Sequence, residues 1–173
     1  LYQGDITISS ANTYKSQLQQ AHVMCDSKER QDTILSAIDG LLQPLKLSLI
    51  KDEDLLTEVS GLVEYPVVLL GTIPEEFMEL PPEVLITTLR NNQKYLMTCT
   101  SDGTLAPYFI IVSNNKAADG GKQIIAGNRK VLIARLSDAM FFYEQDRKQP
   151  LMSRLDPLKN ITFQEKIGTV YEK

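Results

Sequence analysis

The sequence predicts an α+β fold, with helices packed on a mixed sheet that contains at least one antiparallel hairpin. The clearest evidence is at residues 94–114, "KYLMTCTSDGTLAPYFIIVSN", where two β-rich runs flank Asp102 and Gly103, a dipeptide typical of a tight turn. Apolar residues also recur at helical spacing before and after this hairpin. This order of elements argues against a helical bundle and against an all-β sandwich.

Helices and short strands are predicted to alternate over residues 5–60. Ser9 and Ser10 are good N-caps for a helix over "ANTYKSQLQQA", and the short apolar run "HVMC" at residues 22–25 is interpreted as a strand. Asp26 and Ser27 are candidate caps for a helix that ends near Pro44. The apolar positions of that helix share one face and are Ile34, Leu35, Ile38, Leu41 and Leu42.

A further helix is predicted over "KDEDLLTEVSGLV", residues 51–63, because acidic residues occupy its first turn, where the helix dipole favours them. The continuous apolar run in "EYPVVLLGTIP" predicts a central strand, and "PPEVLITTLRNNQ" predicts a helix of two to three turns. We expect residues 1–60 to be a helix-rich acidic segment and residues 61–173 to form the mixed core, both within one domain.

After the hairpin, "NKAADGGKQ" is expected to be a loop and residues 127–148, "GNRKVLIARLSDAMFFYEQDRK", a long helix. Its apolar stripe is Leu132, Leu136, Met140 (or Ala139) and Tyr143, and its aromatic residues are expected in the core. The remaining residues predict a short irregular helix broken at Pro157.

Few groups are suited to metal or nucleophilic chemistry. Cys25 and Cys99 each lie in an apolar segment, and we interpret them as buried, reduced thiols, typical of a cytosolic protein. His22 is the single histidine and no Cys-x-x-Cys pair exists, so a zinc site has too few ligands. On a strand, His22 and Cys25 would point to opposite faces, which argues against a catalytic pair. The sequence predicts neither a catalytic residue nor a metal ligand here.

The chain of 173 residues is 43% apolar and 23% charged, which is ordinary for a soluble globular protein. Its best apolar run, residues 65–70, is strand-sized and too short to span a bilayer. It begins with Leu1 and ends with "YEK", and its first residues resemble no signal or transit peptide. We interpret it as an internal piece of a longer protein.

Charge is divided unevenly along the chain. Residues 1–86 carry 5 Lys and Arg against 14 Asp and Glu, whereas residues 87–173 carry 13 against 8. A polyanion such as RNA is therefore expected to approach the second half and to avoid the first. Arg90, Lys116 and Lys122 are among the cations there that can meet phosphates. The alternative is that these cations only keep helix faces solvated.

Six cations are the candidate phosphate-binding residues: Lys94, Arg129, Lys130, Arg135, Arg147 and Lys148. If the long helix begins at Gly127, Arg129 and Lys130 lie in its first turn, where the helix dipole disfavours cations. Arg147 and Lys148 lie in the last turn, where the helix dipole favours cations. Arg135 has Asp138 three residues away as a candidate partner within the chain. Arg129 and Lys130 are therefore the strongest candidates.

Several of these segments, taken together, resemble the beta subunit of bacterial-type glycyl-tRNA synthetase. The matching motifs are "LVEYP" at residues 62–66, "PEVL" at 82–85, "QKY" at 93–95, the Asp-Gly turn, "GNRKV" at 127–131, "RLSDAMFF" at 135–142, "DRK" at 146–148 and "GTVYEK" at 168–173. The resemblance covers roughly residues 56–173, and residues 1–55 fit the family more loosely.

The resemblance implies a cytoplasmic heterotetramer of two alpha and two beta subunits that attaches glycine to tRNA(Gly) using ATP, with Mg²⁺ expected. Aminoacylation would take place in the alpha subunit, so no cofactor and no catalytic residue is carried over to this chain. The region is also similar to the editing-type domain of phenylalanyl-tRNA synthetase beta subunits. No membrane partner is implied.

Three roles remain open within this resemblance. The first is a tRNA-contacting region that places cations against phosphates and so positions the tRNA. The second is a structural scaffold, in which Gln93, Lys94, Tyr95, Arg135 and Asp138 form an internal polar network. The third is an editing hydrolase of mischarged tRNA. It is the least favoured, because glycine is the smallest substrate and the sequence lacks an obvious base.

Overall fold

Four strands form one antiparallel sheet in the order β1-β3-β4-β2 in the computed structural model, which describes residues 4–114 and 116–172. The strands are β1 (Ser48–Leu49), β2 (Val67–Thr72), β3 (Leu96–Cys99) and β4 (Leu105–Ser113). The predicted hairpin is confirmed, with β3 and β4 antiparallel and Gly103 in the turn at φ 85°. The α+β class is confirmed, although the sheet is antiparallel throughout the described strands rather than mixed.

Strand β2 lies at an edge of the sheet, so the prediction of a central strand was wrong. It pairs with β4 along its whole length, from Val67 opposite Ser113 to Thr72 opposite Tyr108. The apolar run of β2 is explained by the cover on both of its faces. Val68 packs against the core on one face, and Leu69, on the other, is nearly buried beside Gly121. A continuous apolar run reports burial on two faces, not a central place in the sheet.

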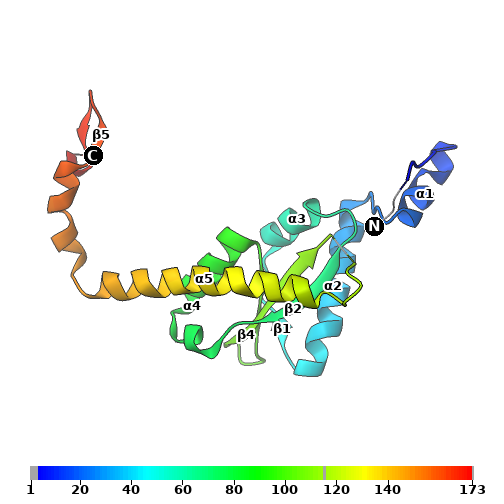
Figure 1. Cartoon of the computed structure of the whole chain (residues 1–173), viewed down its shortest axis with the longest axis horizontal. Coiled ribbons are helices and arrows are strands. Elements are labelled where there is room, and N and C mark those ends of the chain that lie inside the picture. The colour runs from blue at the N-terminus through cyan, green and yellow to red at the C-terminus, as the bar shows by residue number, and fades with distance from the viewer. Residues whose placement is uncertain (1–3, 115, 173) are drawn as a thin grey trace. The chain divides into compact units, whose positions relative to one another are not determined.

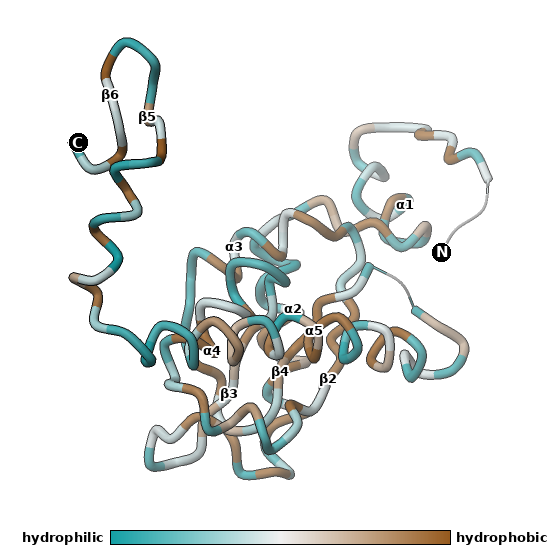
Figure 2. The backbone as a smooth tube through the Cα atoms, turned by 60° about the vertical axis from the view of Figure 1, so that its left-hand side comes forward, coloured by the Kyte–Doolittle hydropathy of each residue, from teal (hydrophilic) through white to brown (hydrophobic). Residues whose placement is uncertain are grey.

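Two capped helices cover one face of the sheet. Asp26 caps α2 (Ser27–Leu42) as predicted, since its Oδ1 accepts from the Glu29 N–H at 3.1 Å. Asp52 caps α3 (Glu53–Gly61) by accepting from the Leu55 N–H at 2.9 Å. The core between these helices and the sheet is formed by Ile34, Ile38, Leu42, Leu55, Val59, Leu96 and Ile110. The hydrophobic segments of Figure 2 include the middle strands of this sheet.

The first residues form the predicted helix, as η1 (Ala11–Thr13) and α1 (Tyr14–Gln20), but without a side-chain cap bond from Ser10. Residues 22–25, expected as a strand, form none; His22 has a left-handed φ of 61° and its ring packs on Tyr65. Cys25 is exposed, so the expectation of two buried thiols was wrong for it; Cys99 is half-buried, and both are free.

Between β2 and the hairpin come η3 (Glu75–Glu79), α4 (Pro82–Thr87) and a π-helical turn, η4 (Thr88–Asn92), in agreement with the predicted short helix. The loop prediction at residues 115–123 includes Asn115, which lies outside the described residues. The long helix α5 (Lys122–Arg147) begins five residues before Gly127, the expected first residue, which lies inside the helix. Asp119 accepts from the Gly121 and Gln123 N–H groups just before and within the start of α5, at 2.9 and 2.8 Å.

The chain divides into two compact units, Leu1–Leu136 and Ser137–Lys173. The second unit holds the end of α5, two short helices η5 (Leu151–Arg154) and η6 (Asp156–Asn160), a hairpin of β5 (Thr162–Gln164) and β6 (Gly168–Thr169), and η7 (Val170–Glu172). The irregular helix is as predicted, but Pro157 lies in the first turn of η6 and the hairpin was not foreseen. The domain division expected from the sequence stays a prediction.

In the first unit, α5 runs across the face of the sheet opposite to the core between α2, α3 and the strands (Figure 1). Its Leu132 and Leu136 are fully buried, as the predicted stripe requires. The expectation for the aromatic residues was wrong, because Phe141 and Phe142 are 55% and 62% exposed. No helix in residues 4–114 and 116–172 is both long and apolar enough to cross a membrane.

A chain of close contacts joins α5 to the sheet. Gly71 lies opposite Phe109 in the β2–β4 register, and a Cβ added to Gly71 would lie 2.3 Å from the Phe109 ring. The ring of Tyr95 also packs on Phe109, with a centroid distance of 4.8 Å. The Tyr95 hydroxyl donates to Asn128 Oδ1 of α5 at 2.7 Å, and Asn128 in turn donates to the Ile124 carbonyl. Because glycine has no side chain, Gly71 leaves the space that the stacked rings of Phe109 and Tyr95 require.

Replacing Gly71 by alanine should destabilise the chain by about 1–3 kcal/mol, because the Phe109 ring must move out of a packed position. The matched control is Gly40→Ala in α2, where an added Cβ meets nothing within 4 Å. That control should raise stability by about 0.5–1 kcal/mol through helix propensity. Urea unfolding followed by circular dichroism measures both, and a Gly71→Ala chain as stable as the original would contradict the packing argument.

Burial raises the pKa of Tyr95 to about 12 from the usual 10.0. The folded state therefore keeps the Tyr95 proton where the unfolded state has lost it. The resulting stability is fully present below pH 10 and is lost between pH 10 and pH 12, by up to about 2–3 kcal/mol. We expect Tyr95→Phe to reduce this loss of stability, measured by urea unfolding across that range. Tyr14→Phe, at an exposed position, should leave it unchanged; equal curves for all three chains would contradict the prediction.

Candidate nucleic-acid interface

Lys94 is held by a structural partner. It follows η4 with a left-handed φ of 57°, and its Nζ lies 2.9 Å from Glu58 Oε1 of α3. Both side chains are partly exposed, so the ion pair is weak, but it neutralises the cation locally. The neighbouring Tyr95 is buried, which turns the "QKY" motif into an anchor between the sheet and α5.

Arg129 is also turned toward the sheet. Its Nε donates to the Thr72 carbonyl at the end of β2, at 3.3 Å, and the side chain is half-buried. Since α5 begins at Lys122, Arg129 and Lys130 lie about two turns into the helix. The dipole argument for this pair was therefore wrong, because the effect falls off within the first turn. It applies instead to Lys122, which is exposed at the first position of α5.

Of the candidates in the first unit, Lys130 and Arg135 are the cations with neither an ion pair nor a side-chain hydrogen bond among the described residues. Both are exposed, and neither makes an ion pair with any residue in 4–114 or 116–172. At about 100° per residue, Lys130 lies about 140° from the line of Leu132 and Leu136, and Arg135 about 80° on its other side. The two side chains thus leave the helix on different sides. Arg135 was expected to take part in an internal polar network with Tyr95. The hydroxyl of Tyr95 instead donates a hydrogen bond to Asn128.

Arg147 and Lys148 belong to the second unit. The Arg147 guanidinium lies over the Tyr143 ring, 5.6 Å from its centroid, in the last turn of α5. Lys148 follows the helix and is exposed. The six candidates are therefore not one surface: Lys94 and Arg129 have partners in the first unit, Lys130 and Arg135 are free there, and the last two belong to another unit.

A bidentate ion pair in the first unit was missed by sequence reasoning. Arg90, at the end of the "PEVLITTLR" helix, binds Asp52 through Nε at 2.5 Å and through a second nitrogen at 3.3 Å. The hydrogen bond from Arg90, with that from the Leu55 N–H, holds the pKa of Asp52 below its usual range. The position of Asp52 just before an acidic first turn is a cap signal, but nothing in the sequence indicates Arg90 as its partner.

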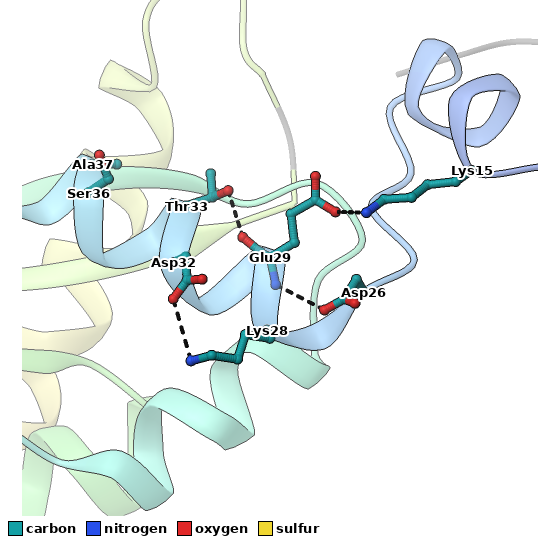
Figure 3. Close-up of a pocket in the computed structure, with 8 residues that line it drawn as sticks. All are labelled: Lys15, Asp26, Lys28, Glu29, Asp32, Thr33, Ser36 and Ala37. Carbon is teal, nitrogen blue, oxygen red and sulfur yellow. Dashed lines mark hydrogen bonds and ion pairs between the residues drawn. The ribbon is translucent and has the colours of Figure 1, made fainter.

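A surface depression at the start of α2 lies away from these cations (Figure 3). It measures about 780 Å³ and is lined by charged side chains that pair with one another. Lys15 binds Glu29 at 2.8 Å and Lys28 lies 3.7 Å from Asp32. Because these charges neutralise each other in an open surface, we assign no ligand to it. Among the described residues no three His, Cys, Asp or Glu side chains are grouped to hold a metal ion.

Comparison with known proteins gives the family. The family model described as glycyl-tRNA synthetase beta subunit matches residues 1–173, including the first 55 residues, which fit the motifs more loosely. The chain is 46% identical over 168 residues to a glycine–tRNA ligase beta subunit of Rhodospirillum centenum, and 44% and 45% identical over 168 residues to those of Streptococcus agalactiae and Acinetobacter baumannii.

Each alignment covers 97% of this chain but only 24–25% of the relative. The chain thus spans about a quarter of the length of the curated relatives it matches. Since the match extends over the whole chain at this level of identity, the chain belongs to the glycyl-tRNA synthetase beta subunit family.

Proposed function

We propose that this chain is a tRNA-positioning part of a glycyl-tRNA synthetase beta subunit. Its relatives carry the name glycine–tRNA ligase beta subunit. In this proposal the whole enzyme is a cytoplasmic heterotetramer of two alpha and two beta subunits that charges tRNA(Gly). ATP and Mg²⁺ would be used in the alpha subunit, and this chain would contribute neither a catalytic residue nor a cofactor ligand.

The observation that supports tRNA contact best is the exposed, unpaired Lys130 on α5. It points away from the buried stripe of its helix and has no ion-pair partner among the residues described. A phosphate group can therefore approach it without breaking an existing ion pair. Arg135 has the same freedom on another side of α5. Contacts of this kind position a nucleic acid and carry no sequence information.

The candidates with partners are expected to contribute less to tRNA binding. A phosphate that recruits Lys94 must compete with Glu58, and one that recruits Arg129 must compete with the Thr72 carbonyl. We therefore rank Lys130 first, Arg135 second, and Lys94 and Arg129 below them. Arg147 and Lys148 belong to the second unit and are not ranked with them.

Lys130→Glu in the full heterotetramer should raise the KM for tRNA(Gly) several-fold while leaving kcat nearly unchanged, because a contact made equally before and during the reaction affects binding alone. The slope of log affinity against log salt should become less steep by about 0.7–0.9 for one lost phosphate contact. Aminoacylation kinetics at several salt concentrations measure both quantities.

The matched control is Lys51→Glu, the same charge reversal at an exposed lysine of the acidic half of the chain. It should leave the KM and the salt slope unchanged. If Lys130→Glu behaves like Lys51→Glu, the tRNA contact at Lys130 is wrong. If both variants raise the KM equally, the effect is due to net charge and the specific contact is again wrong.

The second candidate function is a structural scaffold of the same subunit. It is favoured by the contacts that fix α5 and η4 internally: Tyr95 with Asn128, Arg129 with Thr72 and Arg90 with Asp52. An editing hydrolase, the third reading of the sequence, stays a prediction that no contact among residues 4–114 and 116–172 favours.

A double-mutant cycle with Tyr95→Phe and Asn128→Ala tests the scaffold. The two single variants should each destabilise the chain, with a coupling of about 1 kcal/mol in urea unfolding, because the remaining partner is left without its hydrogen bond. Additive effects would show that this bond does not tie α5 to the sheet. A clear coupling together with an unchanged KM in Lys130→Glu would favour the scaffold over tRNA contact.

A further inference from the structure

The second unit exposes most of its apolar side chains. No residue from Ser137 to Glu172 is buried, although the segment is described throughout. Leu151 is 83% exposed, Met152 74%, and Phe163, in β5, 58%. Figure 2 shows hydrophobic residues spread along this stretch. A soluble protein rarely leaves so many large apolar side chains uncovered.

The contacts described within this unit stabilise it only weakly. A two-stranded hairpin such as β5–β6 is at best marginally stable alone, and chains shorter than about 40 residues usually need a disulfide, a metal or a partner. Both cysteines lie outside the unit, and no metal-binding group is found among the described residues. Its ion pairs, Arg154 with Asp146 and Lys159 with Asp156, are exposed and therefore weak. We therefore expect another protein surface to cover this unit.

The charge of the unit indicates the chemistry of that surface. Residues 137–173 carry six Lys and Arg against six Asp and Glu, so the unit offers no net positive charge to RNA. Several of its cations are already engaged: Arg147 lies over Tyr143, and Lys159 lies 4.7 Å from the centre of the Tyr171 ring. Neutral charge with exposed aromatic and aliphatic side chains fits the core of a protein–protein contact.

We propose that these apolar side chains form an internal interface, covered by the part of the same beta subunit that lies outside residues 1–173. The relatives are about four times as long as the stretch that matches this chain, so most of the subunit is available for this contact. A covalently attached surface acts at an effective concentration of about millimolar, which a separate subunit or a second copy must exceed. This inference rests on the family and not on tRNA contact; it assigns Arg147 and Lys148 to the surroundings of a protein interface.

The test is backbone hydrogen exchange in residues 151–172 of the full-length beta subunit purified without the alpha subunit. We expect exchange at least about tenfold slower than in an unstructured chain, unchanged by subunit concentration or by added alpha subunit. Leu151→Ser and Phe163→Ser should each remove this protection. Leu62→Ser is the matched control, because Leu62 is a 65% exposed leucine of the first unit, and it should leave residues 151–172 protected.

Four results would overturn the proposal. Equal protection of residues 151–172 in the 173-residue chain by itself would make the first unit the occupant. Unprotected amides in the isolated beta subunit would show that nothing in that subunit covers the segment. Protection that develops only with the alpha subunit would make that subunit the occupant, and protection that increases with concentration would indicate a second copy. If the serine variants fail to fold, the exchange of the unmodified subunit still decides between these outcomes.

Discussion

The contact between Phe109 and Gly71 sets the position of α5. Only a residue without a side chain allows the Phe109 ring to lie against β2, and the ring then forms the wall on which Tyr95 packs. Tyr95 is buried with its hydroxyl on Asn128, so one rotational setting of α5 satisfies both the aromatic stack and the hydrogen bond. Leu132 and Leu136 are then buried one and two turns further on. The direction in which every cation of this part of α5 points follows from that setting.

Local signals in the sequence predicted local structure well. The Asp-Gly turn, the Asp26 cap and the spacing of Ile34 and Ile38 each depend on neighbours in the chain, and each was confirmed. The start of α5 was misplaced because Gly127 reads as a boundary, whereas Asp119 supplies the backbone bonds at the start of the helix. The apolar run of β2 reflects the cover on both of its faces, and periodicity alone does not reveal that the strand lies at an edge of the sheet.

The candidate site was predictable in composition but not in geometry. A positive balance after residue 86 can be counted, yet it does not show that Lys94 meets Glu58 or that Arg129 reaches the Thr72 carbonyl. These partners lie 36 and 57 residues away along the chain, respectively. Lys130 and Arg135 differ from their neighbours only in facing solvent without a partner among the described residues. The internal use of cations therefore decides which of them remain available to a phosphate.

Asp52 joins helix α3 to the π-helical turn η4. One carboxylate caps α3 through the Leu55 N–H and also receives Arg90 at the π-helical turn. Opening either element removes partners of that carboxylate, which couples the first turn of α3 to the turn at Thr88–Asn92. The π-helical turn then acts as a spacer: its extra residue per turn brings Arg90 to Asp52 while Tyr95 still reaches the interior. An insertion or deletion within that turn would separate the two anchors, which makes its length, more than its composition, the constrained property.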